Sequence, residues 1–276
     1  MKFVTENDFA QKQAEQEYVI AKDYYERGEY ELAVKYFGAA SKKGHIKATN
    51  KLGICYATGR GVEQSYGRAF ECYEMAAKED YNGAIHNLGL CYYNGFGTKL
   101  NYEKAVEYFR KAGDVGHAVS QYYLAYCYAN GHGVEQNDIE AFCWYRKSAS
   151  HGNIKAQYNL GYCYHNGIGT EQDYYRAISW YENSADEGDA MAQYELGCMY
   201  GTGEGVVQDD KKAYEYFEKS AELGYAPAMY NLGMCYEHGV GIDGDMDTAQ
   251  KWYNKAADNG DELAKEKLTQ IANEQY

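Results

Sequence analysis

The sequence is poor in proline and in long apolar runs. It contains one proline in 276 residues, although glycine reaches 30, and no run of Gly, Ser or Pro marks a linker. No stretch approaches the roughly 18 consecutive apolar residues of a membrane-spanning helix, so we expect no membrane insertion. Residues 1–18 lack the apolar segment of a secretory signal. We expect a cytoplasmic protein, although an effector exported without a signal would look the same.

Basic residues are also scarce. There are 27 Lys and Arg against 41 Asp and Glu, which gives a net charge of -14. Such a chain repels the phosphate backbone, so we do not expect a nucleic-acid partner. A protein or peptide partner is expected to be neutral to basic.

Motifs of catalysis and metal binding are missing too. The sequence has no Cys-x-x-Cys, no His-Glu-x-x-His and no Gly-x-Ser-x-Gly. The acidic run 243–247 resembles the start of a calcium loop, but Thr248 and Asn254 stand where such a loop requires Gly and Glu. We therefore expect no catalytic, cofactor-binding or metal-binding residues. Surface or helix-capping roles are expected for the 7 histidines.

What the sequence does have is an internal repeat. Leucine recurs every 36 residues, and a Gly-x-Gly pair follows it at a fixed distance in six copies. Regular copies of this length are typical of a solenoid of stacked repeats. The leucines are Leu52, Leu88, Leu124, Leu160, Leu196, Leu232 and Leu268, and the pairs begin at Gly59, Gly95, Gly131, Gly167, Gly203 and Gly239.

Each repeat predicts two helices. Between Ala156 and Tyr164 the small and apolar residues recur at helical spacing. Gly-x-Gly then ends the helix, because glycine tolerates the left-handed cap conformation. A phosphate-binding loop would follow a strand and occur once, so we interpret these glycines as structural. Residues of the helix N-cap class open the second helix, and they are Ser65, Asn101, Asn137, Asp173, Asp209 and Asp245.

The 8 cysteines are expected to be buried free thiols. Five of them fall three residues after the repeat leucine, and Met199 fills that position in another copy. A position that accepts methionine favours an apolar filler. Neighbouring helices lie about 8–10 Å apart, whereas a disulfide needs Cα atoms within about 7 Å. The five are Cys55, Cys91, Cys127, Cys163 and Cys235.

The repeat resembles the Sel1-like repeat family. The family pattern A-x-x-x-L-G-x-x-Y-x-x-G-x-G, followed by a capping residue, K/R-A and W-Y, matches residues 156–188 nearly throughout. The resemblance covers about 46–268 and implies an all-α fold, a right-handed αα superhelical solenoid of about seven helix pairs. It also implies the family's usual role as an adaptor. Cysteine-rich secreted relatives carry pairs of cysteines with seven residues between them, and this chain has no such pair.

We expect a single solenoid domain over residues 1–276. Residues 1–45 form its first unit, in which 20–40 lack Gly-x-Gly and resemble a tetratricopeptide repeat. Residues 46–260 hold six 36-residue repeats. Residues 261–276 supply a polar capping helix, as a solenoid end requires.

The candidate partner-binding residues are aromatic and amide side chains of the first helices. On a helical projection at about 100° per residue, Tyr158, Tyr162 and His165 point away from the face of Leu160. In tetratricopeptide-like superhelices such positions resemble those that line the concave groove. A tyrosine two residues before the leucine can equally pack between repeats, and the sequence leaves both interpretations open. The candidates are Asn87, Tyr122, Tyr126, Asn130, Tyr158, Asn159, Tyr162, His165, Asn166, Tyr194, Tyr230 and Asn231.

The leading hypothesis is a monomeric, non-enzymatic scaffold that binds a protein or peptide on its concave surface. Two alternatives stay open. One is β-lactam binding or hydrolysis, which the resemblance to cysteine-rich relatives suggests, and the other is glycan binding through tyrosine faces. Both would require export, and hydrolysis would also require a positioned nucleophile, which the sequence does not show.

Overall fold

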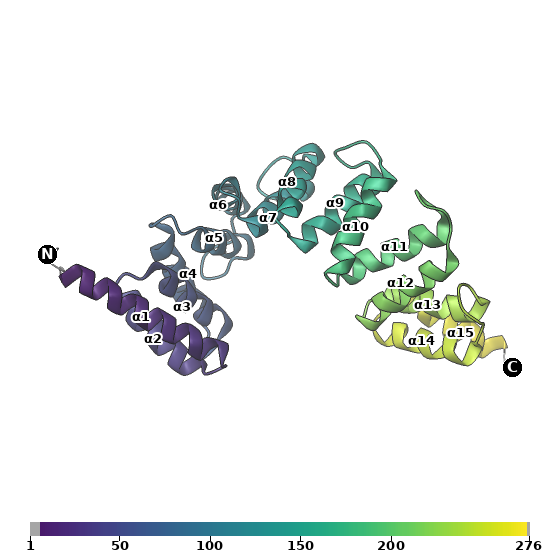
Figure 1. Ribbon diagram of the computed structural model, residues 1–276, viewed down its shortest axis with the longest axis horizontal. Helices are drawn as coiled ribbons and strands as arrows, with labels where there is room; N and C mark the ends of the chain where they lie inside the picture. The colour runs from purple at the N-terminus through teal and green to yellow at the C-terminus, as the bar shows by residue number, and fades with distance from the viewer. Residues whose placement is uncertain (1–5, 275–276) are drawn as a thin grey trace. The chain divides into compact units, whose positions relative to one another are not determined.

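The computed structural model describes residues 6–274 as fifteen helices joined by short turns, with no strand in that range (Figure 1). The predicted fold class, an all-α solenoid of helix pairs, is confirmed. The helices are α1 (Glu6–Glu26), α2 (Tyr30–Lys42), α3 (Ile46–Thr58), α4 (Tyr66–Ala77), α5 (Asn82–Asn94), α6 (Tyr102–Asp114), α7 (Ala118–Asn130), α8 (Asp138–Ser150), α9 (Ile154–Asn166), α10 (Tyr174–Asp186), α11 (Ala190–Thr202), α12 (Asp210–Glu222), α13 (Ala226–His238), α14 (Met246–Asp258) and α15 (Glu262–Glu274).

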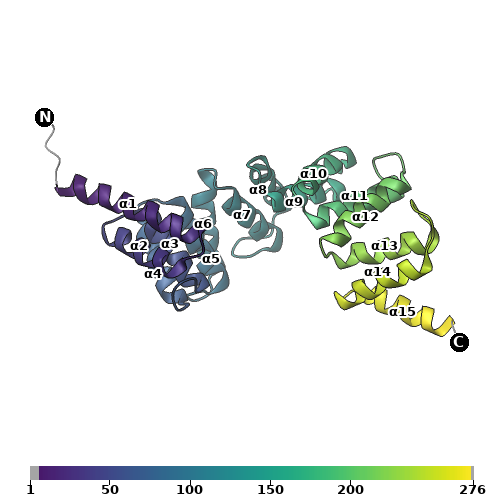
Figure 2. The same cartoon turned by 60° about the horizontal axis from the view of Figure 1, so that its bottom comes forward.

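The chain divides into two compact units, Met1–Trp144 and Tyr145–Tyr276. Within each unit a helix packs against the helices that precede and follow it, as α3 does against α4 and α11 against α12. In the second unit α13 and α14 lie side by side and α15 packs on α14 (Figures 1 and 2). The expected boundaries at 45/46 and 260/261 fall in the turns before α3 and α15. A single domain over the whole chain stays a prediction.

The helix ends follow the predicted capping residues. Asn101, for example, accepts the backbone N–H of Lys104 at 2.8 Å, and Asp173 accepts that of Arg176 at 3.0 Å. Equivalent bonds to Ser65, Asn137, Asp209 and Asp245 confirm the other four N-caps. The first glycine of each Gly-x-Gly pair is left-handed, with φ between 68° and 78°, and closes the first helix.

The second glycine of the pair has a different role. A Cβ at Gly97 would lie 2.2 Å from the carbonyl oxygen of Tyr66, at the start of the preceding repeat's second helix. A Cβ at Gly205 would lie 2.3 Å from the Cβ of Tyr174. Both distances are far below contact, so this glycine allows the loop of one repeat to touch the previous repeat. The structure therefore assigns one glycine to the helix end and the other to packing between repeats.

A glycine next to the repeat leucine brings the two helices of a repeat together. A Cβ at Gly161 would lie 2.7 Å from the ring of Tyr181, which is fully buried. The same relation joins Gly197 to Phe217 at 2.6 Å. We call the rings at this position the aromatic column of the second helices, and its described members are Tyr73, Phe109, Tyr145, Tyr181, Phe217 and Tyr253.

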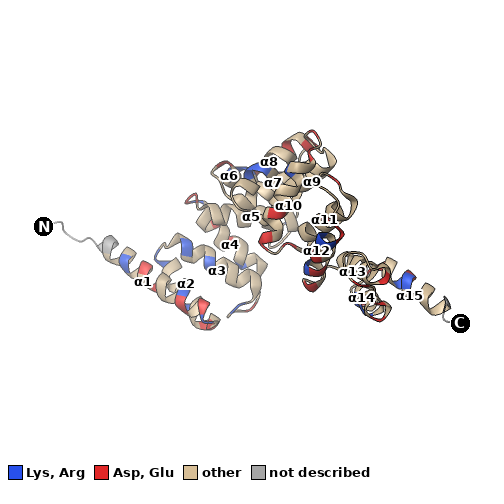
Figure 3. Cartoon of the chain, turned by 45° about the vertical axis from the view of Figure 1, so that its right-hand side comes forward, with Lys and Arg blue, Asp and Glu red and all other residues tan. Residues whose placement is uncertain are grey.

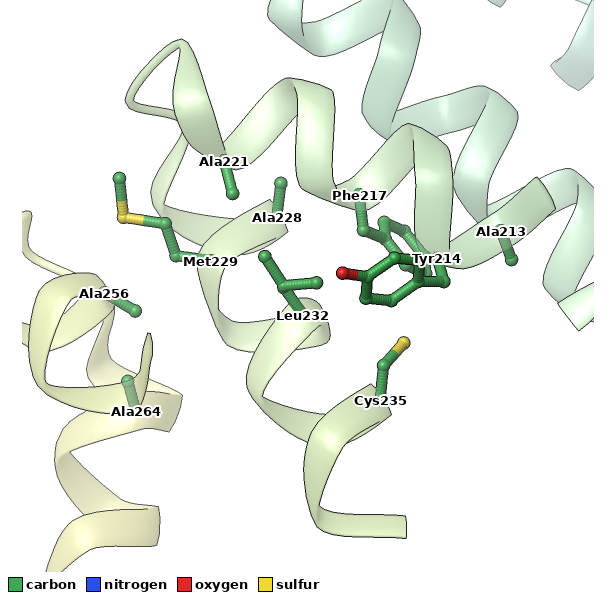
Figure 4. Close-up of a cluster of buried hydrophobic side chains, with 10 residues drawn as sticks. All are labelled: Ala213, Tyr214, Phe217, Ala221, Ala228, Met229, Leu232, Cys235, Ala256 and Ala264. Atoms are coloured by element: carbon green, nitrogen blue, oxygen red, sulfur yellow. The ribbon is translucent and has the colours of Figure 1, made fainter. Parts of the chain in front are cut away.

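The core of the second unit is built from these small and aromatic residues. Phe217 and Tyr214 of α12 face Leu232 and Cys235 of α13, and alanines of α14 and α15 meet beside them (Figure 4). Each repeat buries its own rings against the next pair of helices, so stability is distributed along the unit.

All 8 cysteines are free thiols, as expected, and Cys143 and Cys198 are half-buried while the others are buried. Burial raises the pKa of the Cys55 and Cys91 thiols to about 11. Neutral, buried thiols are poor nucleophiles, which fits the expected role as apolar fillers.

Two histidines have the expected capping role, and one is buried instead. His45 and His117 cap α3 and α7, because Nδ1 of each accepts a backbone N–H three residues on. His86, for which we expected a surface or capping role, is instead buried in α5, with 8 % of its side chain exposed. Its Nδ1 lies 2.9 Å from the hydroxyl of Ser120 on α7. The hydrogen bond compensates for the loss of water and allows the ring to be buried.

Candidate functional site

The first helices of the repeats present one open face. On α9 this face holds Lys155, Asn159, Tyr162 and Asn166, which lie five and one residues before Leu160 and two and six after it. Tyr162 is 42 % exposed, and its counterpart Tyr126 on α7 is 37 % exposed. We call these four positions of each first helix the exposed stripe. It contains large aromatic rings that the fold does not bury.

The asparagines of the exposed stripe bond to their own helix. The side-chain nitrogen of Asn166 donates to the carbonyl oxygen of Tyr162 at 3.0 Å, and that of Asn130 donates to the carbonyl oxygen of Tyr126 at 2.8 Å. Asn159 does the same to Lys155 at 2.8 Å. These bonds fix the amide and leave its oxygen available as an acceptor, so the stripe combines a ring with acceptors on either side of it.

Asn87 differs from the other candidate amides. Its side-chain nitrogen donates to Oδ1 of Asn50, on the first helix of the preceding repeat, at 2.9 Å. The pair links α3 to α5 and engages the amide inside the first unit.

The tyrosines two residues before the leucine are half-buried against the aromatic column. Ring centroids lie 5.8 Å apart for Tyr158 and Tyr181, and 5.5 Å apart for Tyr230 and Tyr253. Tyr194 lies 5.9 Å from Phe217. The sequence left a groove and a packing interpretation open for this row, and the contacts give its members a packing role.

Tyr122 in the first unit has ring neighbours on its own helix. Its ring centroid lies 5.5 Å from that of Tyr123 and 6.5 Å from that of Tyr126. Burial raises the pKa of Tyr122, and the neighbouring tyrosines add to the effect.

His165 joins α9 to the loop before α12. Its Nε2 lies 3.3 Å from Oε2 of Glu204, and its side chain is 18 % exposed. The ring also contacts Tyr174 edge-on, at 5.5 Å between centroids. His165 is therefore held by neighbours on two sides.

The candidate residues fall into two groups, one in each unit. Asn87 on α5 and three residues of α7 belong to the first unit. The others belong to the second unit, where α9 contributes five of them, α11 one and α13 two. The α9 group is the densest, and it is Tyr158, Asn159, Tyr162, His165 and Asn166.

Sequence reasoning did not select three residues that surround the α9 group, namely Glu195, Tyr181 and Tyr225. Glu195 on α11 is half-buried, and burial raises the pKa of its carboxyl. After burial, the charge of Glu195 is the next cause that raises the pKa of Tyr158, Tyr181 and Tyr225. The one signal in the sequence was an acid at a position where Asn87, Asn159 and Asn231 stand in other copies.

The first helices carry few charges. α5 and α7 have no Asp, Glu, Lys or Arg, α9 has Lys155 alone and α11 has Glu195 alone. In Figure 3 these helices are correspondingly almost uncoloured, whereas α12 carries both signs. Within residues 9–273 no three His, Cys, Asp or Glu side chains are grouped as metal ligands would be. In the same range no helix is both long and apolar enough to cross a membrane.

Two hollows lie away from the candidate residues. One of about 750 Å³ is formed by α10, α12 and the loop after α11, and Tyr175, Tyr200, Val207 and Lys212 line it. Another of about 430 Å³ lies in the first unit beside His45 and the turn before α5. Neither hollow is lined by a partner-binding candidate selected from the sequence.

One curated protein is similar to a short stretch of the chain. It is the DAP3-binding cell death enhancer 1 of Rattus norvegicus, 45 % identical over 42 residues, which are 15 % of this chain and 8 % of that protein.

Two solved structures match most of the chain. The crystal structure of c5321, described as a protective antigen of uropathogenic Escherichia coli with an SLR fold, is 33 % identical with a TM-score of 0.81, and the match covers 94 % of this chain and 56 % of that one. A Sel1 repeat protein from Oxalobacter formigenes is 32 % identical with a TM-score of 0.81, over 86 % of this chain and 98 % of that one.

The family model described as Sel1 repeat matches along the chain seven times. One of the matches covers residues 17–45, which include the segment 20–40 that we compared with a tetratricopeptide repeat. The matched residues are 17–45, 46–81, 83–117, 118–153, 154–189, 190–225 and 226–261. With these matches, and with the similarity to both solved structures, the chain belongs to the Sel1 repeat family.

Proposed function

We propose that the chain is a non-enzymatic adaptor that binds a segment of another protein on its concave surface, along the exposed stripes of its first helices. Sel1 repeat proteins are generally scaffolds for protein–protein interactions, and the family is typically non-catalytic. The partner segment is neutral to basic, in keeping with the net charge of -14.

One observation carries the proposal. Tyr162 is a large ring, 42 % exposed, on a helix face where the amides of Asn159 and Asn166 flank it. Tyrosine offers a rigid contact area at a low cost in conformational entropy, and asparagine offers adaptable hydrogen bonds. Aromatic anchors contribute a large part of the binding free energy in protein interfaces. Tyr126 and Asn130 repeat the arrangement in the first unit.

The photo-crosslinking amino acid p-benzoylphenylalanine, placed at residue 162, tests the proposal in native lysate. The matched control places it at residue 175, because Tyr175 is 80 % exposed but lies on the second helix α10. We expect a discrete crosslinked partner from position 162, mapped to one segment of that partner by mass spectrometry. Equal crosslinking from both positions, or a partner from position 175 alone, would contradict the proposal.

A further inference from the structure

Glu195 is an unusual residue for its place in the repeat. It occupies the exposed stripe of α11, at a position where Asn87, Asn159 and Asn231 stand in other copies. It is half-buried, and its carboxylate makes no hydrogen bond or ion pair with any side chain of residues 9–273. Glu237, in contrast, is bonded to the ammonium of Lys267 at 2.7 Å and to the hydroxyl of Tyr253 at 2.5 Å.

A buried hydroxyl without a partner lies beside Glu195. Tyr181 is fully buried, and its hydroxyl makes no hydrogen bond. Its counterpart Tyr253 donates to Glu237. The charge of Glu195 acts on the Tyr181 hydroxyl, yet the two groups are not hydrogen-bonded to each other. A buried hydroxyl without a hydrogen bond is unfavourable, so the polar groups near Glu195 are not satisfied by the fold itself.

Aromatic rings lie near the Glu195 carboxylate. Tyr158 packs on Tyr181 at 5.8 Å between centroids, and Tyr225, at the start of α13, packs on Tyr194 at 5.3 Å. Glu195 acts electrostatically on all four rings. Tyr162 lies one turn along α9 from Tyr158. We call Glu195, Tyr158, Tyr181, Tyr225 and this exposed Tyr162 the Glu195 cluster.

This chemistry matches an organic cation. A partly buried carboxylate without a partner is unfavourable, and a bound cation stabilises it by forming an ion pair. The faces of tyrosine rings also attract an ammonium or guanidinium group. Its N–H groups can donate to the carboxylate oxygens. A divalent metal would need several oxygen ligands, and Glu195 is the sole carboxylate of α9 and α11. His165 lies near enough to Glu195 to lower the pKa of its carboxyl, against the larger effect of burial, but its Nε2 is bonded to Glu204.

We propose that the Glu195 cluster binds one basic side chain, lysine or arginine, of the partner segment. The inference rests on the proposed adaptor function and names the chemistry that its second unit recognises. Tyr162, the exposed member, contacts the aliphatic part of the side chain, and Glu195 pairs with the charged end. Glu195, an acid without a partner where other copies carry asparagine, thus makes this position specific for a basic side chain.

The probe for the test is Nα-acetyl-lysine N-methylamide, with its arginine analogue and the uncharged norleucine analogue. Each is titrated into the isotope-labelled full chain, and amide and tyrosine-ring NMR shifts are recorded. We expect the lysine and arginine probes to shift signals of α9, α11 and Tyr225, with norleucine at least about tenfold weaker, equivalent to about 1.4 kcal/mol. Equal shifts from norleucine, or shifts spread over the surface, would overturn the proposal.

Two variants separate the site from the overall charge. Glu195→Asn introduces the residue that other copies carry at this position, and we expect it to fold and to weaken lysine binding about fivefold or more, by loss of the ion pair. Glu171→Gln removes the same charge from an exposed loop residue and is expected to leave binding within about twofold, as for a rim charge. Equal weakening by both would indicate general attraction and refute the site. If position 162 still crosslinks a partner while the lysine probe fails, the adaptor function stands and this inference falls.

Discussion

Tyr158 and Tyr162 stand one turn apart on α9 but in different surroundings. Tyr158 packs against the buried ring of Tyr181, whereas Tyr162 is 42 % exposed. We expect Tyr158→Ala to lower the free energy of unfolding by about 2–3 kcal/mol, since the loss of a packed ring leaves a cavity. Tyr162→Ala is expected to change it by less than about 0.5 kcal/mol. Urea unfolding followed by circular dichroism measures both, and equal effects would contradict the assignment.

That contrast also bears on binding experiments. A combined Tyr158→Ala and Tyr194→Ala change would reduce partner capture partly by loosening α9 and α11, because both rings pack on the aromatic column. Tyr162→Ala isolates recognition from stability, since its ring is exposed.

His86 makes the stability of the first unit depend on pH. Burial, assisted by the nearby His117, lowers the pKa of His86 from 6.5 to about 3. The unfolded chain therefore binds a proton more readily than the folded one. The contribution of neutral His86 is fully present above pH 6.5 and is lost progressively as the pH falls toward 3. We expect a loss of about 2 kcal/mol between roughly pH 7 and pH 5, at about 1.4 kcal/mol per unit.

The comparison that isolates this effect uses His86→Tyr. Tyrosine stands at the equivalent position in four other copies, and it has no charge to gain in this range. Urea unfolding at each pH gives the difference between the two proteins, which removes the contribution of the acidic residues. A difference that stays constant between pH 7 and pH 5 would show that His86 does not titrate against burial. The prediction rests on the buried position of His86, where its ring is bonded to the hydroxyl of Ser120. That hydroxyl also lies 2.9 Å from Nδ1 of His117.

For single residues, the sequence predicted which side chains lie on the exposed face better than it predicted their hydrogen-bond partners. It selected Tyr162 and Asn166 because their types and spacing are visible in the repeat. It could not predict that Tyr181 would be buried without a hydrogen bond, because the partner of its counterpart, Glu237, comes from another helix. Such a difference depends on which side chains meet across a pair of helices.

Among the elements, the helix pairs depend on glycine beside the leucine. A Cβ at Gly53 would lie 2.6 Å from the ring of Tyr73, which is buried. We expect Gly53→Ala to destabilise the chain by about 1–3 kcal/mol through overpacking of α3 against α4. Thermal and urea unfolding measure the change.

Gly38 is the matched control, because it lies within α2 and an added Cβ would meet nothing within 4 Å. Gly38→Ala should stabilise the chain by about 0.5–1 kcal/mol, as alanine favours the helix. If the two changes had the same sign, close approach would not be what Gly53 provides.

The helix boundaries were predictable because local chemistry sets them. Asp173 and Gly167 act on their own neighbours, through a capping bond and a left-handed φ. The second glycine of each pair was not explained by the sequence, since its reason is Tyr66 or its equivalent in the previous repeat. The spacing of residues in the repeat does not show which residues of another repeat they will contact.

α15 covers the last repeat that the family model matches. Ile271 is buried with Tyr253 and Ala249 of α14, and Leu268 packs beside them. We expect deletion of 261–276 to uncover these rings, to lower the melting temperature and to promote self-association, because an open solenoid end exposes apolar surface. Size-exclusion chromatography and thermal unfolding measure both effects.

A pair of point changes keeps that prediction falsifiable if the shortened chain fails to fold. Ile271→Asp places a charge in the buried contact and should cost about 3 kcal/mol or more. Leu263→Asp is made on the same helix at a residue that is 59 % exposed, and it should be close to neutral. Equal unfolding free energies for the two variants would mean that α15 does not cover α14.

For the whole molecule, the charge balance concerns association more than folding. The net charge is -14, yet the exposed stripes of α5, α7 and α9 contain no acid. Glu195 is the acid that we place on the receiving face, and most of the other acids lie on second helices, loops and the terminal helices, where their field attracts a basic segment from outside that face. Long-range attraction and short-range contact are thus assigned to different residues.

The two contributions predict different kinetic responses for the partner segment identified by crosslinking. Raising the salt concentration from about 50 mM to about 500 mM shortens the Debye length several-fold, and we expect the association rate to fall by about tenfold, as for steered encounters. The dissociation rate should change little with salt. Tyr162→Ala should act in the opposite way and raise the dissociation rate, because it removes a buried contact of the complex. Surface plasmon resonance with the immobilised partner segment separates the two rates, with Tyr175→Ala as the unaffected control. An association rate insensitive to salt would show that the partner is not basic, and a Tyr162→Ala effect on association alone would show that the ring is outside the interface.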